Sequence, residues 1–264
     1  MQWSRLFVAP VPSNRTPLPL WIRALNFCIA GLLISLLFYL PFQRLAYHLR
    51  WDSVYKYREM FLLGWLTTIS ISVSALVLST TIGLAAALAQ RSSWLTLRYL
   101  SKIYVELVRG TPLLVQILIF FYVIADAFGV SNRYVVGVLT LSIFSGAYIS
   151  EIIRAGIESI GQSQLESARA IGLTRSQTYR YVIFPQALRQ TLPPLAGQFV
   201  SLIKDSSLLS IISISEFTWN AQTVNSRTFS TLESYIPLAA GYLILTLPIS
   251  LWTRHLERKH RFET

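Results

Sequence analysis

The sequence predicts an all-α protein that crosses a membrane several times, and both its composition and the grouping of its apolar residues support that class. Hydrophobic residues make up 53% of the 264 residues and charged residues only 13%, about half the roughly 25% usual in soluble domains. The mean hydropathy is +0.50, and the apolar residues lie in long blocks rather than at the spacing of a soluble core. A soluble domain of this composition would lack the polar surface to cover itself.

Six stretches are long enough to cross a bilayer, which takes about 20 apolar residues in a helix. The predicted spans are residues 24–40, 61–89, 113–128, 134–150, 192–214 and 235–252. The first is long and no small-residue cleavage site follows it, so we expect an uncleaved anchor rather than a signal peptide. The fifth is interrupted by Lys204 and Asp205.

The placement of basic residues predicts how these spans are oriented. Sixteen of the 23 Lys and Arg residues fall in the N-terminus, loops 91–109 and 154–189 and the C-terminal tail, and six fall in the opposite loops. By the positive-inside rule, both termini and loop 154–189 are expected in the cytoplasm. Segment 43–60 stays basic on the outer side, but its Trp and Tyr residues are typical of a membrane interface, so we expect a short helix along the outer surface there.

Several classes of enzyme are excluded by what the sequence lacks. Cys28 is the only cysteine and the three histidines form no His-Glu-x-x-His motif, so we expect no disulfide framework and no metal centre. There is no P-loop and no Gly-x-Ser-x-Gly motif. An intramembrane hydrolase would need a nucleophile with a base, or a metal, and neither is found. We therefore expect no catalytic residues and no cofactor bound by this chain.

Segment 161–194 carries the signals of two short helices joined by a tight turn. Ser163 and Glu166 have the spacing of a capping box at the start of the first helix. Gly172 is placed to end that helix in a left-handed conformation, which glycine adopts without steric cost.

A second helix is expected directly after this turn. Thr174 and Gln177 form another capping box, and the helix is expected to run to the neighbourhood of Pro185. Taken alone, the two helices are typical of a DNA-binding helix-turn-helix, which would make the protein a membrane-anchored regulator. Their place between two membrane spans favours an element that docks on a partner, or an amphipathic loop on anionic lipid, and the residues by themselves leave these alternatives open.

The charges within span 192–214 indicate a functional site. A charged residue costs about 2.5–3.5 kcal/mol in the middle of a bilayer on insertion scales, so Lys204 and Asp205 are candidates for contact with a transported substrate. Gln198, Ser201 and Asp205 fall on one helical face, whose amide, hydroxyl and carboxylate suit an α-ammonium group. The alternatives are a buried ion pair or helix end that only stabilises the fold, or a short helix that ends at the polar surface. The candidate substrate-path residues are Gln198, Ser201, Lys204, Asp205 and Ser206.

Prolines mark two expected helix starts. Pro193 and Pro194 favour a start just before Leu195. Upstream, Thr111 is a good N-cap residue, and Pro112 suits the first position of the helix that would follow it.

Charged residues are also expected where spans leave the membrane on the cytoplasmic side. Arg109 would lie at this interface, where its expected role is in orientation. Glu151 and Arg154 are three residues apart on a helix and are expected to form an ion pair, with a structural role favoured over one in transport.

Segment 161–194 resembles the EAA loop in the membrane subunits of binding-protein-dependent ABC importers. The run Glu166-Ser167-Ala168, then Gly172, Val182 and Phe184-Pro185 keep that family's spacing, with conservative departures at positions 167, 182 and 184. In that family the loop inserts a short coupling helix into a groove of the ATPase subunit. The resemblance implies ATPase-coupling roles for Ser163, Glu166, Ser167, Ala168, Ala170, Gly172 and Leu173.

More of the chain resembles one branch of that family, the permeases for polar amino acids. The similar motifs are residues 106–116 (ELVRGTPLLVQ), 147–154 (AYISEIIR), 192–198 (LPPLAGQ) and 201–208 (SLIKDSSL). They occur in the same order, and the match runs from about residue 64 to the C-terminus. Span 24–40 lies outside the family's five-helix core and looks like an added N-terminal helix.

This resemblance implies a division of the chain and a function. Residues 1–60 would hold the N-terminal segment, the added span and the external segment, and residues 61–264 the permease core with its coupling loop at about 156–194. The chain would import polar amino acids across a bacterial inner membrane by alternating access. The implied partners are a second permease copy or homologous permease, an extracytoplasmic amino-acid-binding protein, membrane lipid and an ATPase dimer that holds ATP and Mg, without nucleic acid.

Overall fold

The computed structural model describes residues 19–44 and 47–260. The chain divides into two compact units, Met1–Leu49 and Arg50–Thr264. The first unit contributes one described helix, α2 (Leu20–Arg44), whose large apolar side chains are mostly exposed within this chain. Part of the orientation prediction depends on residues outside the described ranges, namely Arg5, Arg15 and the C-terminal end.

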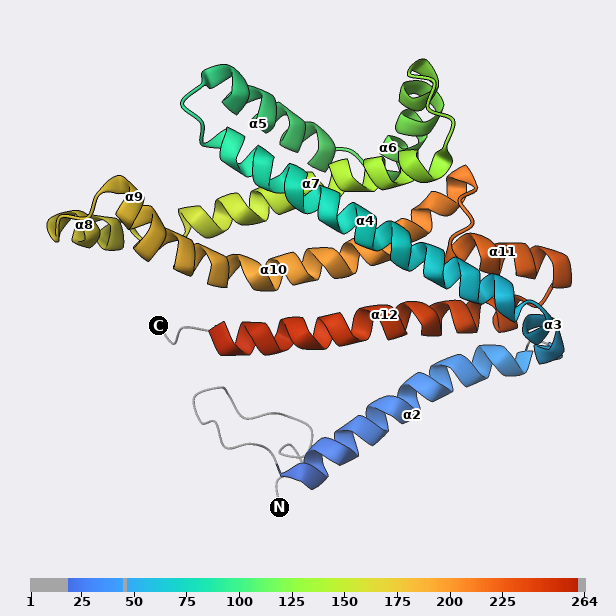
Figure 1. Ribbon diagram of the computed structural model, residues 1–264. Coiled ribbons are helices and arrows are strands. Elements are labelled where there is room, and N and C mark those ends of the chain that lie inside the picture. Colours follow the sequence, from blue (N-terminus) through green and yellow to red (C-terminus); the bar gives the residue numbers. More distant parts are fainter. Residues whose placement is uncertain (1–18, 45–46, 261–264) are drawn as a thin grey trace. The chain divides into compact units, whose positions relative to one another are not determined.

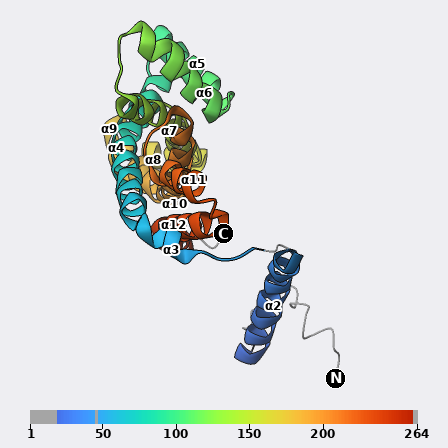
Figure 2. The same ribbon diagram turned by 90° about the vertical axis from the view of Figure 1, so that its right-hand side faces the viewer.

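Long helices of the second unit lie lengthwise beside one another (Figure 1). α7 packs against both α4 and α10, and α12 packs against α10. Helices α5 and α6 lie at the side of this group away from α12 (Figure 2). The bounds are α3 (Trp51–Lys56), α4 (Arg58–Gln90), α5 (Leu95–Arg109), α6 (Leu113–Ile119), η1 (Phe120–Ala125), α7 (Arg133–Glu158), α8 (Gln162–Ala170), α9 (Arg175–Thr178), η2 (Tyr179–Ile183), α10 (Phe184–Asp205), η3 (Ser206–Ile212), α11 (Phe217–Thr228) and α12 (Thr231–His260).

The helices confirm the predicted all-α, multi-span class. In the described part of the chain, five helices are long and apolar enough to cross a membrane, and the bent pair formed by α5 and α6–η1 makes a sixth if it is counted as one span. The short helix expected in segment 43–60 is present as α3.

The region around the third span differs in part from the prediction. Loop 91–109 is mostly the amphipathic helix α5. The helix expected at residues 113–128 is present as α6–η1, but it is bent by 108° from α5 and makes a candidate span only together with it. Pro112 has φ −64° and ψ 138°, so the backbone at the bend is extended, and proline has no N–H to continue a helix. The basic residues of α5 lower its mean hydropathy, so a search for long apolar blocks passes over it, although its apolar residues have the spacing of an amphipathic helix.

The capping predicted for Thr111 is also wrong, because Pro112 is the N-cap of α6. The Thr111 hydroxyl instead donates to the carbonyl oxygen of Leu107 at 2.9 Å. The Gln116 side chain reaches back from within α6 and donates to the Thr111 hydroxyl at 2.8 Å and to the Val108 carbonyl oxygen at 2.7 Å. Gln116 of α6 therefore provides hydrogen bonds to the Val108 carbonyl oxygen and the Thr111 hydroxyl beside the bend.

Helix α10 runs through the prolines that were expected to start it. Residues Arg175–Ile212 form one candidate span of 38 residues, so the expected stop near Pro185 and the expected start near Leu195 are both wrong. Pro185 lies in the first turn of α10, directly after the π-helical η2. Proline lacks an N–H and so leaves a gap in the hydrogen bonds of a helix, and π-helical turns are often found at such irregularities. Pro193 and Pro194 lie inside the helix, where membrane proteins tolerate proline because neighbouring groups satisfy the freed carbonyls.

Contacts between the long helices depend on small residues. A Cβ atom at Gly83 of α4 would lie 2.6 Å from Cγ2 of Ile149 in α7, and one at Gly156 of α7 would lie 2.2 Å from Cγ2 of Thr191 in α10. Lipid tails are as apolar as leucine, so close backbone approach, rather than escape from solvent, holds such helices together. An apolar core between α4, α6, α7, α10 and η3 includes Ile71, Ile117, Leu141, Leu202 and Leu209.

A buried carboxylate joins three helices where the chain reverses after η3. Glu216 is fully buried and is the N-cap of α11, accepting from the backbone N–H groups of Thr218 and Trp219 at 2.8 and 2.7 Å. Its carboxylate also accepts from the Tyr242 hydroxyl of α12 at 3.1 Å and from the Thr68 hydroxyl of α4 at 3.4 Å. One side chain therefore holds α4, α11 and α12 together.

Glu216→Ala is expected to lower the melting temperature of the purified protein. Loss of an N-cap acceptor costs about 0.5–2 kcal/mol, and buried donors left without a partner add about 1–3 kcal/mol. Glu216→Gln keeps the shape and one acceptor, so it should lose less. Thermal unfolding in detergent, followed by circular dichroism, gives the melting temperatures of the wild type and both variants. An unchanged melting temperature in Glu216→Ala would contradict this role.

Candidate functional site

Helices α8 and α9 form the predicted coupling loop and lie at one end of the long helices (Figure 1). The start of α8 differs from the prediction, because Gly161, with φ −59° and ψ 143°, is the N-cap and the helix begins at Gln162. Ser163 is then already helical and makes no capping hydrogen bond, so the capping box of Ser163 and Glu166 is wrong. A capping hydroxyl must come from a residue whose own backbone is still outside the helix.

The end of α8 confirms the predicted left-handed turn. Gly172 has φ +81°, and the N–H groups of Gly172 and Leu173 each donate to carbonyl oxygens of the last turn at 3.0 Å, which is the Schellman arrangement. The predicted second capping box is also present, with the Gln177 N–H donating to the Thr174 hydroxyl at 3.3 Å and the Thr174 N–H donating to the Gln177 side chain at 2.8 Å. These two caps fix the turn between α8 and α9.

Most of the predicted coupling residues lie on the surface of this loop. Exposed are Ser163, Glu166, Ser167, Ala170 and Gly172, whereas Leu173 is half-buried and Ala168 is buried. Ile171, which no sequence signal marked, is 77% exposed and lines a hollow of about 360 Å³ beside α8.

The helix-turn-helix alternative is not supported by α9. This helix has only four residues and continues through η2 into α10 as part of a candidate membrane span. A DNA-recognition helix must be free to enter the major groove, and α9 is the start of an apolar stretch instead.

The predicted polar face of α10 is formed by three half-buried side chains, Gln198, Ser201 and Asp205. The Gln198 side chain donates to the hydroxyl of Ser145 in α7 at 3.3 Å. Among the described residues, no group hydrogen-bonds to the Asp205 carboxylate or to the Ser201 hydroxyl. These two groups are therefore available to a ligand, whereas Gln198 is partly engaged within the fold.

Lys204 and Asp205 do not form an ion pair in the described part of the chain. Lys204 is exposed while Asp205 is half-buried, and successive residues of a helix do not face each other. The buried hydroxyl of Ser206 donates to the Ile203 carbonyl oxygen at 2.8 Å, so it is engaged within its own helix. The contacts of Lys204 and Asp205 thus give no support to the alternative of a structural ion pair.

An ion-pair network joins two of the sequence motifs at the end of α7 nearest α8. Arg154 donates two hydrogen bonds of 2.9 Å to Glu151, which confirms that pair. Arg109 of α5 also pairs with Glu151, at 3.1 Å, and its guanidinium lies 5.4 Å from the centre of the Tyr148 ring. Arg109 therefore ties α5 to α7. No sequence signal marked this contact, because Arg109 and Glu151 lie far apart along the chain.

The five or six apolar helices define a multi-span membrane protein, and a capped, exposed helical loop lies at one end of them. The chain matches the family described as "Binding-protein-dependent transport system inner membrane component" over residues 79–262. It belongs to this family of transport subunits, as the resemblance predicted.

Individual relatives agree with this membership. The chain is 36% identical over 211 residues to the glutamine transport system permease protein GlnP of Escherichia coli strain K12, covering 79% of this chain and 96% of that protein. It is 38% identical over 223 residues to the L-cystine transport system permease protein TcyB of Bacillus subtilis strain 168, covering 83% and 95%. Its structure is similar, with a TM-score of 0.75 and 36% identity, to a chain from "Crystal structure of an amino acid ABC transporter with histidines", covering 81% of this chain and 100% of that one.

Proposed function

We propose that the chain is the membrane-spanning permease of an ABC importer for polar amino acids, which forms the translocation path and couples it to a separate ATPase. The observation that carries this proposal is the similarity to permeases named for glutamine and cystine, which extends over 79% and 83% of the chain. The capped, exposed loop formed by α8 and α9 and the half-buried polar face of α10 agree with it.

The proposed assembly places this chain among several subunits. It pairs with a second copy or a homologous permease, with two ATPase subunits on the cytoplasmic side and an amino-acid-binding protein on the outer side. The excess of basic residues supports an orientation with both termini and α8 in the cytoplasm. Residues 1–60 form an added N-terminal part, and residues 61–264 form the permease core.

The polar face of α10 is the proposed contact with substrate. The Asp205 carboxylate meets the ammonium group that every amino acid carries, and exclusion of water strengthens that attraction. The Ser201 hydroxyl and Gln198 amide offer hydrogen bonds on the same face, followed by Ser206 at the helix end. The exposed Lys204 supplies the opposite charge for a carboxylate.

The loop formed by α8 and α9 is the proposed contact with the ATPase, with Ile171 as an apolar anchor beside the residues that the resemblance marks. ATP supplies the energy at that partner. Because Arg175–Ile212 is one helical stretch, a displacement of α8 and α9 is transmitted along α10 to the polar face. This displacement switches the side to which the path opens.

The orientation predicts a pattern of chemical labelling. In a Cys28→Ser background, Ser176→Cys in the exposed part of α9 should be shielded from an impermeant thiol reagent added to intact cells, and Ser53→Cys should react. Labelling of Ser176→Cys after permeabilisation is the control that this position is reachable. Labelling of the same variant in intact cells would overturn both the orientation and the coupling role.

The coupling role predicts a backbone effect at Gly172. Gly172→Val should reduce substrate-stimulated ATP hydrolysis by the assembled complex, because a positive φ costs a β-branched residue about 1–3 kcal/mol. Apart from Gly172 and its two chain neighbours, no described residue has an atom within 4 Å of where a Cβ would lie, so the effect would come from the backbone rather than from a clash. Gly172→Asn is the matched control and should retain more stimulation, since Asn tolerates the left-handed region. Equal stimulation in all three proteins would argue against the coupling role.

The substrate contact predicts a charge effect at Asp205. Asp205→Asn keeps the size of the side chain but removes its charge, so uptake by the reconstituted complex should fall strongly. Asp205→Glu should retain more uptake, and Ser201→Ala should cost only about 0.5–1.5 kcal/mol, the value of one neutral hydrogen bond.

The melting temperature of each variant is the control for this experiment. A residue that only stabilises the fold would lower the melting temperature together with uptake, whereas a substrate contact lowers uptake alone. Full uptake by Asp205→Asn at normal expression would end the substrate-path hypothesis.

A further inference from the structure

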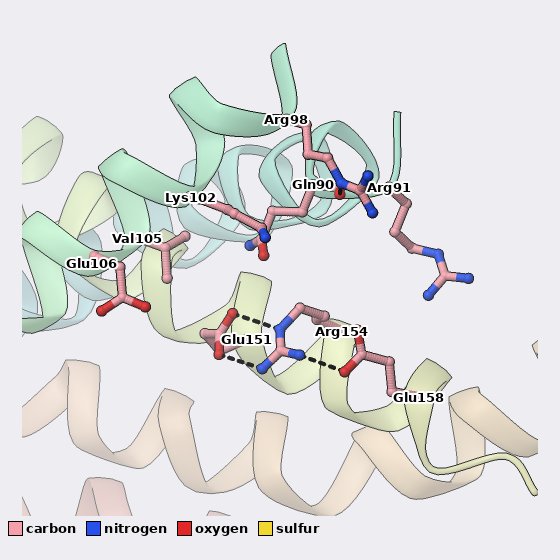
Figure 3. A pocket seen from close by; sticks show the side chains of 9 residues that line it. All are labelled: Gln90, Arg91, Arg98, Lys102, Val105, Glu106, Glu151, Arg154 and Glu158. Atoms are coloured by element: carbon pink, nitrogen blue, oxygen red, sulfur yellow. Dashed lines mark hydrogen bonds and ion pairs between the residues drawn. The ribbon is translucent and has the colours of Figure 1, made fainter. Parts of the chain in front are cut away.

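A charged pocket lies at the end of the long helices from which α8 leads (Figure 3). Its volume is about 480 Å³, and it is lined by the end of α4, one face of α5 and the last turns of α7. None of its lining residues belongs to α8 or α10, so it is separate from both the proposed coupling surface and the proposed substrate path.

On the α7 side of the pocket, the charges are already paired. Arg154 lies between Glu151 and Glu158 and hydrogen-bonds to both. Glu151 also pairs with Arg109 at 3.1 Å. The two carboxylates of this side are therefore balanced by two guanidinium groups, and Glu106 of α5 is the third acidic residue of the pocket.

The α4–α5 side carries cations that lack a carboxylate partner. Arg91, Arg98 and Lys102 form no ion pair with any described residue. Arg98 is held in place by a hydrogen bond of 3.1 Å from Nε to the carbonyl oxygen of Gln90, which leaves its terminal nitrogens available. Four basic and three acidic side chains line the pocket, and Arg109 adds a fifth positive charge behind Glu151. This excess of positive charge favours an anion, and guanidinium and ammonium donors suit phosphate.

The outer face of α5 is apolar beside these cations. Its apolar stripe consists of Leu95, Tyr99, Ile103 and Leu107, each between 54% and 64% exposed. Arg98 and Lys102 have the same four-residue spacing, so they form a neighbouring stripe on the helix. Trp94, just before α5, is 78% exposed, and tryptophan is typical of a membrane interface. A molecule with an anionic head and apolar chains could contact both stripes at once.

We propose that this pocket binds the phosphate group of an anionic phospholipid, whose acyl chains lie along the apolar stripe of α5. Basic pockets between membrane helices are suited to such headgroups. The bound lipid bridges α4 and α5 to α7, and because α8 begins four residues after Glu158, it stiffens the base of the loop formed by α8 and α9. The proposal is independent of which substrate the protein carries, and it requires only that this end of the helices lies at a membrane surface.

Native mass spectrometry of the full chain, purified in neutral detergent, tests the proposal by titration with phosphatidylglycerol or with phosphatidylcholine of identical acyl chains. The wild type should bind phosphatidylglycerol more tightly. Arg98→Gln/Lys102→Gln should weaken that binding about 30-fold, since each basic residue near an anionic lipid contributes roughly a factor of five. Its binding of phosphatidylcholine should not change. Retention of wild-type affinity for phosphatidylglycerol would overturn the proposal.

Three controls keep the result interpretable. Arg98→Lys/Lys102→Arg keeps both charges and should preserve binding, which separates loss of charge from misfolding.

Arg175→Gln/Arg180→Gln removes two exposed cations outside the pocket and should leave the affinity for phosphatidylglycerol unchanged. An equal loss of affinity in this variant would overturn the proposal, because it would show only general attraction of the lipid to the basic surface. Glycerol 3-phosphate tests the source of the phosphate, and if it competes at the same concentration as the lipid, the site is one for a soluble anion and the lipid assignment is wrong.

Discussion

The contact between α4 and α7 is the constraint on which the rest of the helical unit depends. Gly83 has no side chain, so Ile149 packs directly against the backbone of α4. The Gln90 side chain donates to the Ser150 hydroxyl at 3.0 Å and closes the contact at its end. Helix α5 rests on this pair, with the Ser101 hydroxyl donating to the α4 backbone at 2.8 Å. Such contacts matter in a bilayer because apolar side chains gain little by leaving lipid for protein.

The opposite end of the unit shows how irregular backbone is accommodated beside the membrane spans. After Asp205 the chain narrows into the 3₁₀ segment η3, turns at Ser213 with φ +57°, and enters α11 at Glu216. Non-helical backbone at membrane depth is tolerated only where protein or a water-filled cavity surrounds it, and here Leu209 and Ile214 are fully buried. The half-buried Asp205 is the last residue of α10, where this helix gives way to η3 within the protein.

Helix α9 and the polar face of α10 lie on one continuous helical stretch. No loop interrupts Arg175–Ile212, and Gln198 links this stretch to Ser145 of α7, the helix that enters the loop formed by α8 and α9 from its other side. The loop formed by α8 and α9 is therefore joined at its two ends to α7 and α10, which pack against each other. The charged pocket lies at the last turns of α7, just before this loop begins.

Local chemistry in the sequence determined the apolar stretches, the caps formed by Gly172 and by Thr174 with Gln177, and the pairing of Arg154 with Glu151, because each depends on residues a few positions apart. Other features were decided only by tertiary packing. Neighbouring helices and the π-helical turn η2 override the helix-breaking tendency of prolines in α10. The packing of α5 against α4 and α7 was also decided there, because helical spacing does not say which elements a helix contacts. The ion pair of Arg109 with Glu151 joins segments that are far apart in the chain, and so does the charged pocket lined by α4, α5 and α7. Residue spacing within one segment does not encode which helices will meet.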